Sequence, residues 1–280
     1  MDPLQIGITV TSVMMLMIFF GMRVAFASAL AGTAGLVWIL SSKLGLEKAL
    51  YAGLGMAGTI PHSKAVTYAL SILPMFILIG FLAFHAGLTK SLFEAAKRWL
   101  GRLPGGLAVA TVFATAGFAA VSGASTATAA VFARVAIPEM LRDGYNRRLA
   151  AGVVAAGGTL ATLIPPSAIL VIYAIIVEES VGQLLLAGFL PGIVSALIYG
   201  LIIVSIVSFK PEMGPKTRFF SFKEKIVSLP GTVPIFSVII IIFGSMYFGW
   251  ATPTEAGALG AFVVFVLSLI HISEPTRQVQ

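Results

Sequence analysis

The 280-residue sequence contains no cysteine and few charged residues. Without cysteine, the chain can form neither a disulfide framework nor a thiolate metal site, and it has no cysteine nucleophile. Charged residues make up only 10% of the chain and hydrophobic residues 58%, whereas soluble domains contain about 25% charged and 45–50% apolar residues. Several apolar runs approach the length of about 20 residues that a membrane-crossing helix needs. The composition therefore predicts an all-α polytopic membrane protein.

The sequence also lacks the motifs of common membrane enzymes. No HExxH, GxSxG or P-loop pattern occurs, and no acidic pair lies inside an apolar span, which argues against an intramembrane protease, a lipid hydrolase and an ATP-driven pump. We therefore expect that the protein is not an enzyme and holds no cofactor. Because no basic run is interleaved with aromatic residues, the net charge of +7 is attributed to cytoplasmic loops and no nucleic-acid partner is expected.

Apolar segments divide the chain into spans and connections. One stretch, SLFEAAKRWL, is charged and amphipathic, and we expect it to lie at the membrane interface. The first apolar segment is interpreted as a retained span, because it lacks the pattern of a cleaved signal peptide. The predicted elements are spans at residues 4–20, 24–40, 69–87 and 181–209, an interfacial helix at 90–101, a re-entrant hairpin at 105–141 and a broken span at 149–177.

Basic residues orient these elements in the bilayer. They form four groups, which are Arg23; Lys90, Lys97, Arg98 and Arg102; Arg142, Arg147 and Arg148; and Lys210, Lys216, Arg218, Lys223 and Lys225. If residues 105–141 enter and leave on one side, all four groups lie on the same side, which should be cytoplasmic, and the N-terminus is periplasmic. The connection Ser41–Lys64 is basic yet falls outside. If residues 105–141 instead crossed the membrane twice, the chain would return to the same side. Charge alone therefore does not establish a re-entrant hairpin.

The stretch FAAVSGASTATAAVFARVAIPEM, residues 118–140, joins two apolar arms of about 15 to 17 residues, which are short for a crossing. Non-helical backbone at membrane depth is tolerated only where protein or water covers it. Hydroxyl and carbonyl oxygens suit a dehydrated alkali cation, and helix N-termini at a break attract an anion. The tip is therefore a candidate site for both a cation and a carboxylate. Alternatively, its small residues only allow close helix packing.

A second break is predicted in GGTLATLIPPS, residues 157–167. Pro165 and Pro166 each remove an amide donor and clash with the carbonyl four residues back, so the helix must open there. The opening would expose carbonyl oxygens near Ala161 and Ile164. A purely structural kink is the alternative to an ion or substrate site. Polar residues that cluster at two helix breaks favour alternating access over a channel, which would need a continuous polar pore.

Five stretches carry a resemblance to a known family: LPGGLAVATVFATAGFAAVSGAS, IPEMLRDGY, AAGGTLATLIPPSAILVIYA, LLLAGFLPG and ATPTEAGALGA. They are similar to the large membrane subunit of tripartite ATP-independent periplasmic (TRAP) transporters, the DctM-like family, from about Ile6 to about Phe262. The resemblance implies a sodium-coupled secondary transporter with an elevator-type motion in the bacterial inner membrane. It also implies three partners besides the lipid bilayer: a periplasmic binding protein, a small membrane subunit, and a carboxylate substrate such as a C4-dicarboxylate or related organic acid.

The resemblance also implies a site at the two breaks. The sodium ligands would be Ser122, Gly123, Ala124 and Ser125 at the hairpin tip and Ala161, Ile164 and Pro166 at the unwound helix. Substrate contacts are expected at Ser125, Thr126, Thr159 and Ser167. Two positions depart from the family pattern. Ala124 stands where relatives often have a polar residue, which could remove one ligand, and Ala161 stands where they commonly have glycine.

Several charged residues have competing interpretations. Arg134 falls inside the second hairpin arm, where a charge is either functional or snorkels toward the cytoplasmic end. Glu139 and Asp143 are expected to pair with Arg142 or Arg147. Glu255 follows Pro253 with Thr252 before it, so its carboxylate is expected to support the first turn of a helix.

The resemblance sets the expected domain organisation. Transporters of this kind contain two inverted repeats, and we expect the first at residues 1–209, a cytoplasmic loop at 210–229 and the start of the second at 230–266. Residues 267–277, LSLIHISEPTR, resemble the translation of a transposase adapter, so residues 267–280 are interpreted as a foreign tail rather than a genuine short tail. Such a chain ends just after the second repeat has started and lacks the second hairpin, its unwound helix and the other half of the substrate site, so it is expected not to transport. A non-transporting membrane assembly subunit is the alternative function.

A long sequencing read across the source locus tests this organisation. We expect the reading frame to continue past Val266 through a second apolar half with another Ser/Gly hairpin, near a gene for a periplasmic binding protein. A frame that stops after the codon for Gln280 would instead favour the half-size assembly subunit.

Overall fold

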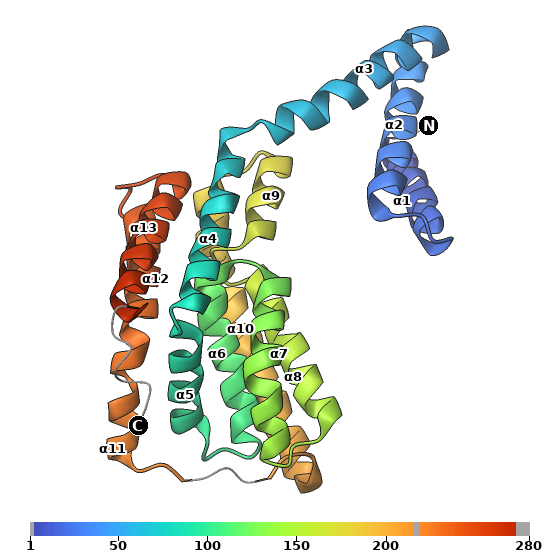
Figure 1. The fold of residues 1–280 in the computed structure, drawn as a ribbon. Helices are drawn as coiled ribbons and strands as arrows, with labels where there is room; N and C mark the ends of the chain where they lie inside the picture. Colours follow the sequence, from blue (N-terminus) through green and yellow to red (C-terminus); the bar gives the residue numbers. More distant parts are fainter. Residues whose placement is uncertain (1–2, 216–218, 273–280) are drawn as a thin grey trace. The chain divides into compact units, whose positions relative to one another are not determined.

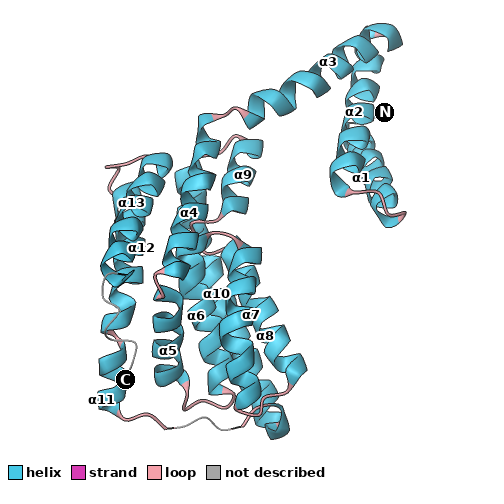
Figure 2. Ribbon diagram, viewed as in Figure 1, coloured by secondary structure: helices cyan, strands magenta, loops and turns pink. Residues whose placement is uncertain are grey.

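The computed structural model describes residues 3–215 and 219–272, and these form helices and connecting loops without a β-strand (Figure 2). The chain divides into two compact units, residues 1–67 and residues 68–280. Each unit is considered by itself. The helical content agrees with the all-α expectation.

The first unit contains three helices, α1 (Pro3–Phe19), α2 (Val24–Leu44) and α3 (Leu46–Ala65) (Figure 1). Helix α2 packs against both α1 and α3 through small residues, and its buried positions are Ala27, Ala31 and Gly35. A Cβ atom on Gly35 would lie 2.8 Å from Val10 Cγ2. Small residues thus bring the helix axes close together, as is usual for helices in membranes.

Residues 41–64 were expected to be a connection between spans, but most of them are helical. Helix α2 continues to Leu44, the chain turns at Gly45 (φ +78°), and α3 then covers most of the segment. Alanine, leucine, lysine and glutamate dominate the first turns of α3, and these residues have high helix propensity. Helix α3 is not among the helices that are long and apolar enough to cross a membrane.

The first part of the second unit consists of six α-helices and two 3₁₀ turns, and both predicted breaks lie among them. Their bounds are η1 (Tyr68–Ser71), α4 (Ile72–His85), α5 (Leu88–Leu100), α6 (Gly106–Ser122), α7 (Ser125–Arg142), α8 (Arg147–Thr159), η2 (Leu160–Thr162) and α9 (Ala168–Val177). The predicted interfacial helix corresponds to α5, and the predicted hairpin to α6 and α7.

The remaining elements are α10 (Val181–Phe209), η3 (Pro211–Met213), α11 (Phe222–Ser228), η4 (Pro230–Thr232), α12 (Val233–Tyr247) and α13 (Pro253–Ile272). As predicted, Thr252 and Glu255 cap α13: the Thr252 amide donates to Glu255 Oε2 over 2.8 Å. Helix α13 includes residues 267–272 of the predicted tail, and the other tail residues lie outside the described part of the chain. The origin of the tail stays a prediction.

Helix α6 occupies the centre of the second unit. It contacts α4, α5, α7, α8, α10 and α12, and nearly all of its residues are buried. A helix that is apolar on all sides is expected in such a position. Two of its three buried hydroxyls are satisfied within the helix, because Thr111 donates to Leu107 O (2.8 Å) and Thr115 donates to Thr111 O (2.5 Å). Burial of α6 on all sides makes it the helix around which the unit packs.

Four helical segments of the described residues are long and apolar enough to cross a membrane: Val24–Leu44, Tyr68–His85, Val181–Phe209 and Phe222–Tyr247. Helices α1, α6, α9 and α13 are apolar but shorter. Helix α7 is in neither group. The first hairpin arm, α6, thus falls in the same shorter group as α1, which was predicted to span, and the re-entrant character of the hairpin stays a prediction.

Glu139 on α7 pairs with Lys97 on α5 rather than with the expected Arg142 or Arg147. The pair joins the amphipathic helix to the second hairpin arm. Burial opposes the charged form of Lys97, but the hydrogen bond and charge of Glu139 together raise its pKa above 10.5. Because the folded-state pKa is raised, the stabilisation is complete at neutral pH and is lost only as the pH rises beyond that value.

Tyr145 closes the end of the hairpin away from its tip. This side chain is 4% exposed, and its hydroxyl accepts a hydrogen bond of 3.2 Å from the amide of Leu107. Leu107 lies in the first turn of α6, where amides have no partner within the helix. The phenol thus satisfies a buried donor between the two arms.

We expect Tyr145→Phe to lower the free energy of unfolding by about 1–2 kcal/mol, because the Leu107 amide loses its acceptor without regaining water. Tyr173→Phe on α9 is the matched control, since this ring is 54% exposed. Thermal unfolding in detergent measures both. Equal melting temperatures for the two variants would contradict the assignment.

Candidate functional site

The hairpin tip is a tight turn of two residues between helices. Helix α6 ends at Ser122 and α7 begins at Ser125, with Gly123 and Ala124 between them. Gly123 has φ +62°, a left-handed conformation that an L side chain adopts only at a cost. Ala124 is extended, with φ −122°. The Gly-Ala pair therefore reverses the chain and leaves two helix ends at the tip.

The tip lies directly against the second break. A Cβ atom on Gly123 would lie 2.3 Å from Pro166 O, so only glycine fits at this contact. The Gly123 carbonyl also accepts a hydrogen bond of 3.1 Å from the amide of Ala168, the first residue of α9. The contact places the N-terminus of α9 beside the N-terminus of α7.

The predicted break between residues 157 and 167 is confirmed. Helix α8 ends at Thr159, η2 follows, and an irregular segment leads to α9 at Ala168. Leu160 O accepts hydrogen bonds from the amides of both Leu163 (3.0 Å) and Ile164 (2.7 Å). Pro165 and Pro166 provide no further donors, so the helical hydrogen-bond series stops here.

The break leaves buried carbonyl groups available. Ala161 is fully buried and Ile164 is 6% exposed. Within the described residues, no hydrogen bond reaches the carbonyl oxygen of either residue. Most buried carbonyl groups in proteins have a partner, so two that lack one at a helix break are notable candidates for ligands.

The tip hydroxyls differ in their surroundings. Ser122 Oγ lies 2.7 Å from Thr128 Oγ1, and both side chains are buried. Ser125 is half-buried and Thr126 is exposed, and neither hydroxyl has a hydrogen-bond partner among the described residues. The structure thus separates a paired hydroxyl beneath the turn from two available hydroxyls at the start of α7.

The other two hydroxyls expected to contact substrate are already bonded. Ser167 is fully buried, donates to Thr162 O (2.8 Å) and accepts from the amide of Leu170, which caps α9. Thr159 donates to Ala156 O (2.7 Å) and lies 3.2 Å from the hydroxyl of Tyr199 on α10. Their roles as substrate contacts stay predictions.

Thr128 is a further polar residue of the tip, for which the sequence predicts no role. It lies six residues after Ser122, on the α7 face that turns back toward α6. In the sequence, Thr128 is simply one of a run of small hydroxyl residues. The helical periodicity does not tell which of these residues faces the opposite arm. Thr128 positions the Ser122 hydroxyl.

Arg134 projects from the exposed face of α7 and makes no ion pair within the described residues. The same part of the chain contains no group of three or more His, Asp or Glu side chains that could hold a metal ion. An oxygen-lined break is therefore the candidate ion site, rather than a cluster of charged side chains.

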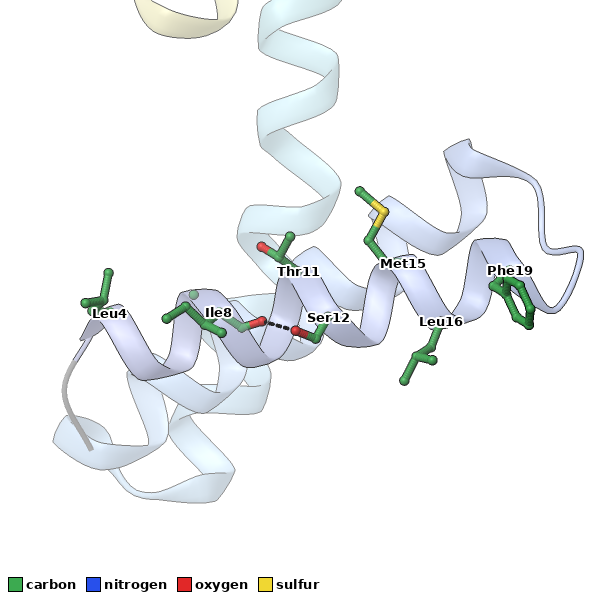
Figure 3. Close-up of a pocket in the computed structure, with 8 residues that line it drawn as sticks. Leu4, Ile8, Thr11, Ser12, Met15, Leu16 and Phe19 are labelled. Carbon is green, nitrogen blue, oxygen red and sulfur yellow. Dashed lines mark hydrogen bonds between the residues drawn. The ribbon is translucent and has the colours of Figure 1, made fainter.

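Two hollows lie near apolar side chains. One of about 160 Å³ adjoins the hairpin tip and is lined by Ile77, Gly80, Phe81, Phe84, Phe118, Ser122, Ala124, Ala127 and Val131. The other, about 1000 Å³ and wide open, follows one face of α1 (Figure 3). Ser12 on that face donates to Ile8 O (2.8 Å) and offers no free donor. An apolar face of this kind suits lipid or another helix better than a polar ligand.

Gly123→Ala tests the contact between tip and break. We expect it to lower the free energy of unfolding by at least about 1–2 kcal/mol, the cost of a left-handed residue with a side chain, because the new methyl group also meets Pro166 O. Gly152→Ala on α8 is the control, because a Cβ there meets nothing within 4 Å. Thermal unfolding should show a loss for the first variant and none for the second. Equal stability of both would contradict the contact.

Comparison with known proteins shows the family of this chain. Residues 11–279 match the family model for the tripartite ATP-independent periplasmic transporter, DctM component. The C4-dicarboxylate TRAP transporter large permease DctM of Pseudomonas aeruginosa is 38% identical over 205 residues, or 73% of this chain and 48% of the relative. The DctM of Vibrio cholerae is 32% identical over 252 residues, or 90% and 53%. The sialic acid permease SiaM of Vibrio cholerae is 30% identical over 269 residues, or 94% and 58%.

The chain thus spans about half the length of these relatives. All three are named as permeases, not enzymes, and together with the apolar helices they indicate a multi-pass membrane protein. The match covers nearly the whole chain, including both helix breaks, and this chain therefore belongs to the DctM component family of tripartite ATP-independent periplasmic transporters.

Proposed function

We propose that this chain contributes a sodium site and part of an anion site to a secondary transporter that imports an organic acid. The observation that carries the proposal is the contact of Gly123 with Pro166 and Ala168, which joins two breaks in helices. Each break supplies oxygen atoms that accept no hydrogen bond within the helices. The named permease relatives favour this role over a non-transporting assembly subunit.

The sodium ligands are proposed among the residues of the two breaks. Carbonyl oxygens of Ala161 and Ile164 lie buried without a hydrogen-bond partner among the described residues, and Ser122 and Ser125 add hydroxyl oxygens at the facing tip. Neutral oxygen ligands at unwound helices are a known arrangement for Na⁺ in secondary transporters. Ala124 offers only its backbone, so a polar ligand at this position is absent.

The anion is proposed to bind at the helix N-termini beside the same contact. Helices α7 and α9 start at Ser125 and Ala168, and the hydrogen bond from Ala168 to Gly123 keeps these starts adjacent. Helix N-termini carry partial positive charge and free amides, both of which favour a carboxylate. The available hydroxyls of Ser125 and Thr126 are then placed to donate to it.

The substrate is proposed to be a small organic anion, with a C4-dicarboxylate as the first candidate. Three relatives are named for C4-dicarboxylates, and others for sialic acid, isethionate and 2,3-diketo-L-gulonate. We propose a periplasmic binding protein and a small membrane subunit as partners, and an elevator-type motion of the hairpin in the bacterial inner membrane. We also propose a periplasmic N-terminus, because the four basic groups then all lie on the cytoplasmic side.

A sodium-specific shift in thermal stability tests the site without requiring transport. For the chain as it stands, NaCl should raise the melting temperature above that in KCl at equal ionic strength, since a ligand at ten times its dissociation constant stabilises by about 1.4 kcal/mol. The double variant Ser122→Ala/Ser125→Ala should lose this difference. Ser205→Ala should keep it, because that hydroxyl is exposed and donates only to Leu201 O.

Either of two results would refute the proposal. A double variant that retains the full sodium-specific shift would place the ion elsewhere. A chain that melts at the same temperature in NaCl and KCl would have no sodium site of useful affinity.

A further inference from the structure

A polar pocket of about 420 Å³ lies between α5 and the segment that contains α11 and η4, away from the two helix breaks. Its lining residues are Lys90, Ser91, Glu94, Arg98, Val227, Ser228 and Gly231. A Cβ on Gly231 would lie 3.2 Å from Ser91 Cβ, so the loop after α11 packs closely on the first turn of α5. The pocket is therefore built by two segments that are about 130 residues apart in the sequence.

The charged side chains in the pocket do not balance one another. Lys90, Glu94 and Arg98 follow one another at four-residue intervals on the same face of α5. Lys90 is exposed and forms no ion pair within the described residues, and Arg98 only donates a long hydrogen bond of 3.4 Å to Glu224 O. Two cations thus flank one carboxylate, and the pocket retains a net positive charge.

Other groups in the pocket suit a phosphate ester. Ser91 is half-buried, and its hydroxyl has no partner among the described residues. Ser228 already donates its hydroxyl hydrogen to Lys225 O (2.6 Å), so Ser91 is the serine of the pocket that can donate to a phosphate oxygen. A guanidinium, an ammonium and a free hydroxyl within one recess are the donors that bind phosphate oxygens most strongly.

The surroundings of the pocket are those of a membrane interface. Trp99, on the same helix as Arg98, is 42% exposed, and its indole N–H donates to Lys225 O over 3.2 Å. The Lys225 ammonium lies 5.9 Å from the centre of that ring. Val227 in the pocket wall is 64% exposed, and Phe222 on α11 is 71% exposed. Aromatic and apolar side chains beside clustered cations are typical of the headgroup region of a bilayer.

We propose that this pocket binds the phosphate headgroup of an anionic phospholipid. Lys90 and Arg98 hold the phosphate, Ser91 donates to it, and the acyl chains extend over the exposed apolar residues of α11. Glu94 limits the affinity for the lipid, because its negative charge repels the phosphate. Charge complementarity and the adjoining apolar surface favour a lipid over free phosphate.

Lipid binding to the purified full chain in an uncharged detergent tests the proposal. Dioctanoyl phosphatidylglycerol should bind about tenfold more tightly than dioctanoyl phosphatidylcholine at low salt, as measured by native mass spectrometry. Lys90→Gln/Arg98→Gln should remove this preference. Arg147→Gln/Arg148→Gln removes the same charge from exposed positions on α8 and should retain it.

Glu94→Gln is expected to bind the lipid more tightly, and a variant that fails to fold could not give that result. The affinity of this variant for phosphatidylglycerol should increase about threefold, because a repelling charge is removed. Three outcomes would overturn the proposal: equal affinity for the two lipids, equal loss in both double variants, or displacement of the lipid by inorganic phosphate at the same concentration. The last result would identify a site for free phosphate.

Discussion

The close approach of Gly123 to Pro166 is the contact on which the rest of the candidate site depends. In a membrane, an interrupted helix must find other partners for its backbone groups or cover them with protein. Here the two interruptions partly satisfy one another, because Gly123 O accepts from the Ala168 amide. A side chain at position 123 would push the breaks apart, so the absence of a Cβ atom permits the whole arrangement.

Burial of α6 holds that contact in place. Helix α6 is surrounded by neighbouring helices on nearly every side, and its small residues allow them to approach closely. At the far end, Tyr145 ties the first turn of α6 to the chain after α7, and Lys97 on α5 pairs with Glu139 on α7. The hairpin is therefore anchored at its base, and its tip presents polar groups to the break in the α8–α9 span.

The proposed site combines two kinds of polarity without a charged side chain at its centre. Carbonyl oxygens at the break favour a cation, and adjacent helix N-termini favour an anion. Both arise because helices end there, so one structural event creates both halves of the site. Charged side chains of α5 instead line a separate pocket, where their chemistry suits the membrane interface.

The amino-acid sequence by itself determined the helical class, the hairpin at residues 105–141 and the break before α9, because glycine and paired prolines act locally on the backbone. It did not determine the helix at residues 46–65, since this segment is less apolar than the predicted spans and a search for apolar runs does not find it. Only the tertiary structure decided that Thr128 supports Ser122, that Ser167 and Thr159 bond to other groups, and that Glu139 pairs with Lys97. Thr159 and Tyr199 are 40 residues apart and Lys97 and Glu139 are 42 apart, so only packing brings these pairs together. Ser122 and Thr128, and Ser167 and Thr162, are close in sequence, but the geometry of the turn and of the break decides which hydroxyl meets which partner.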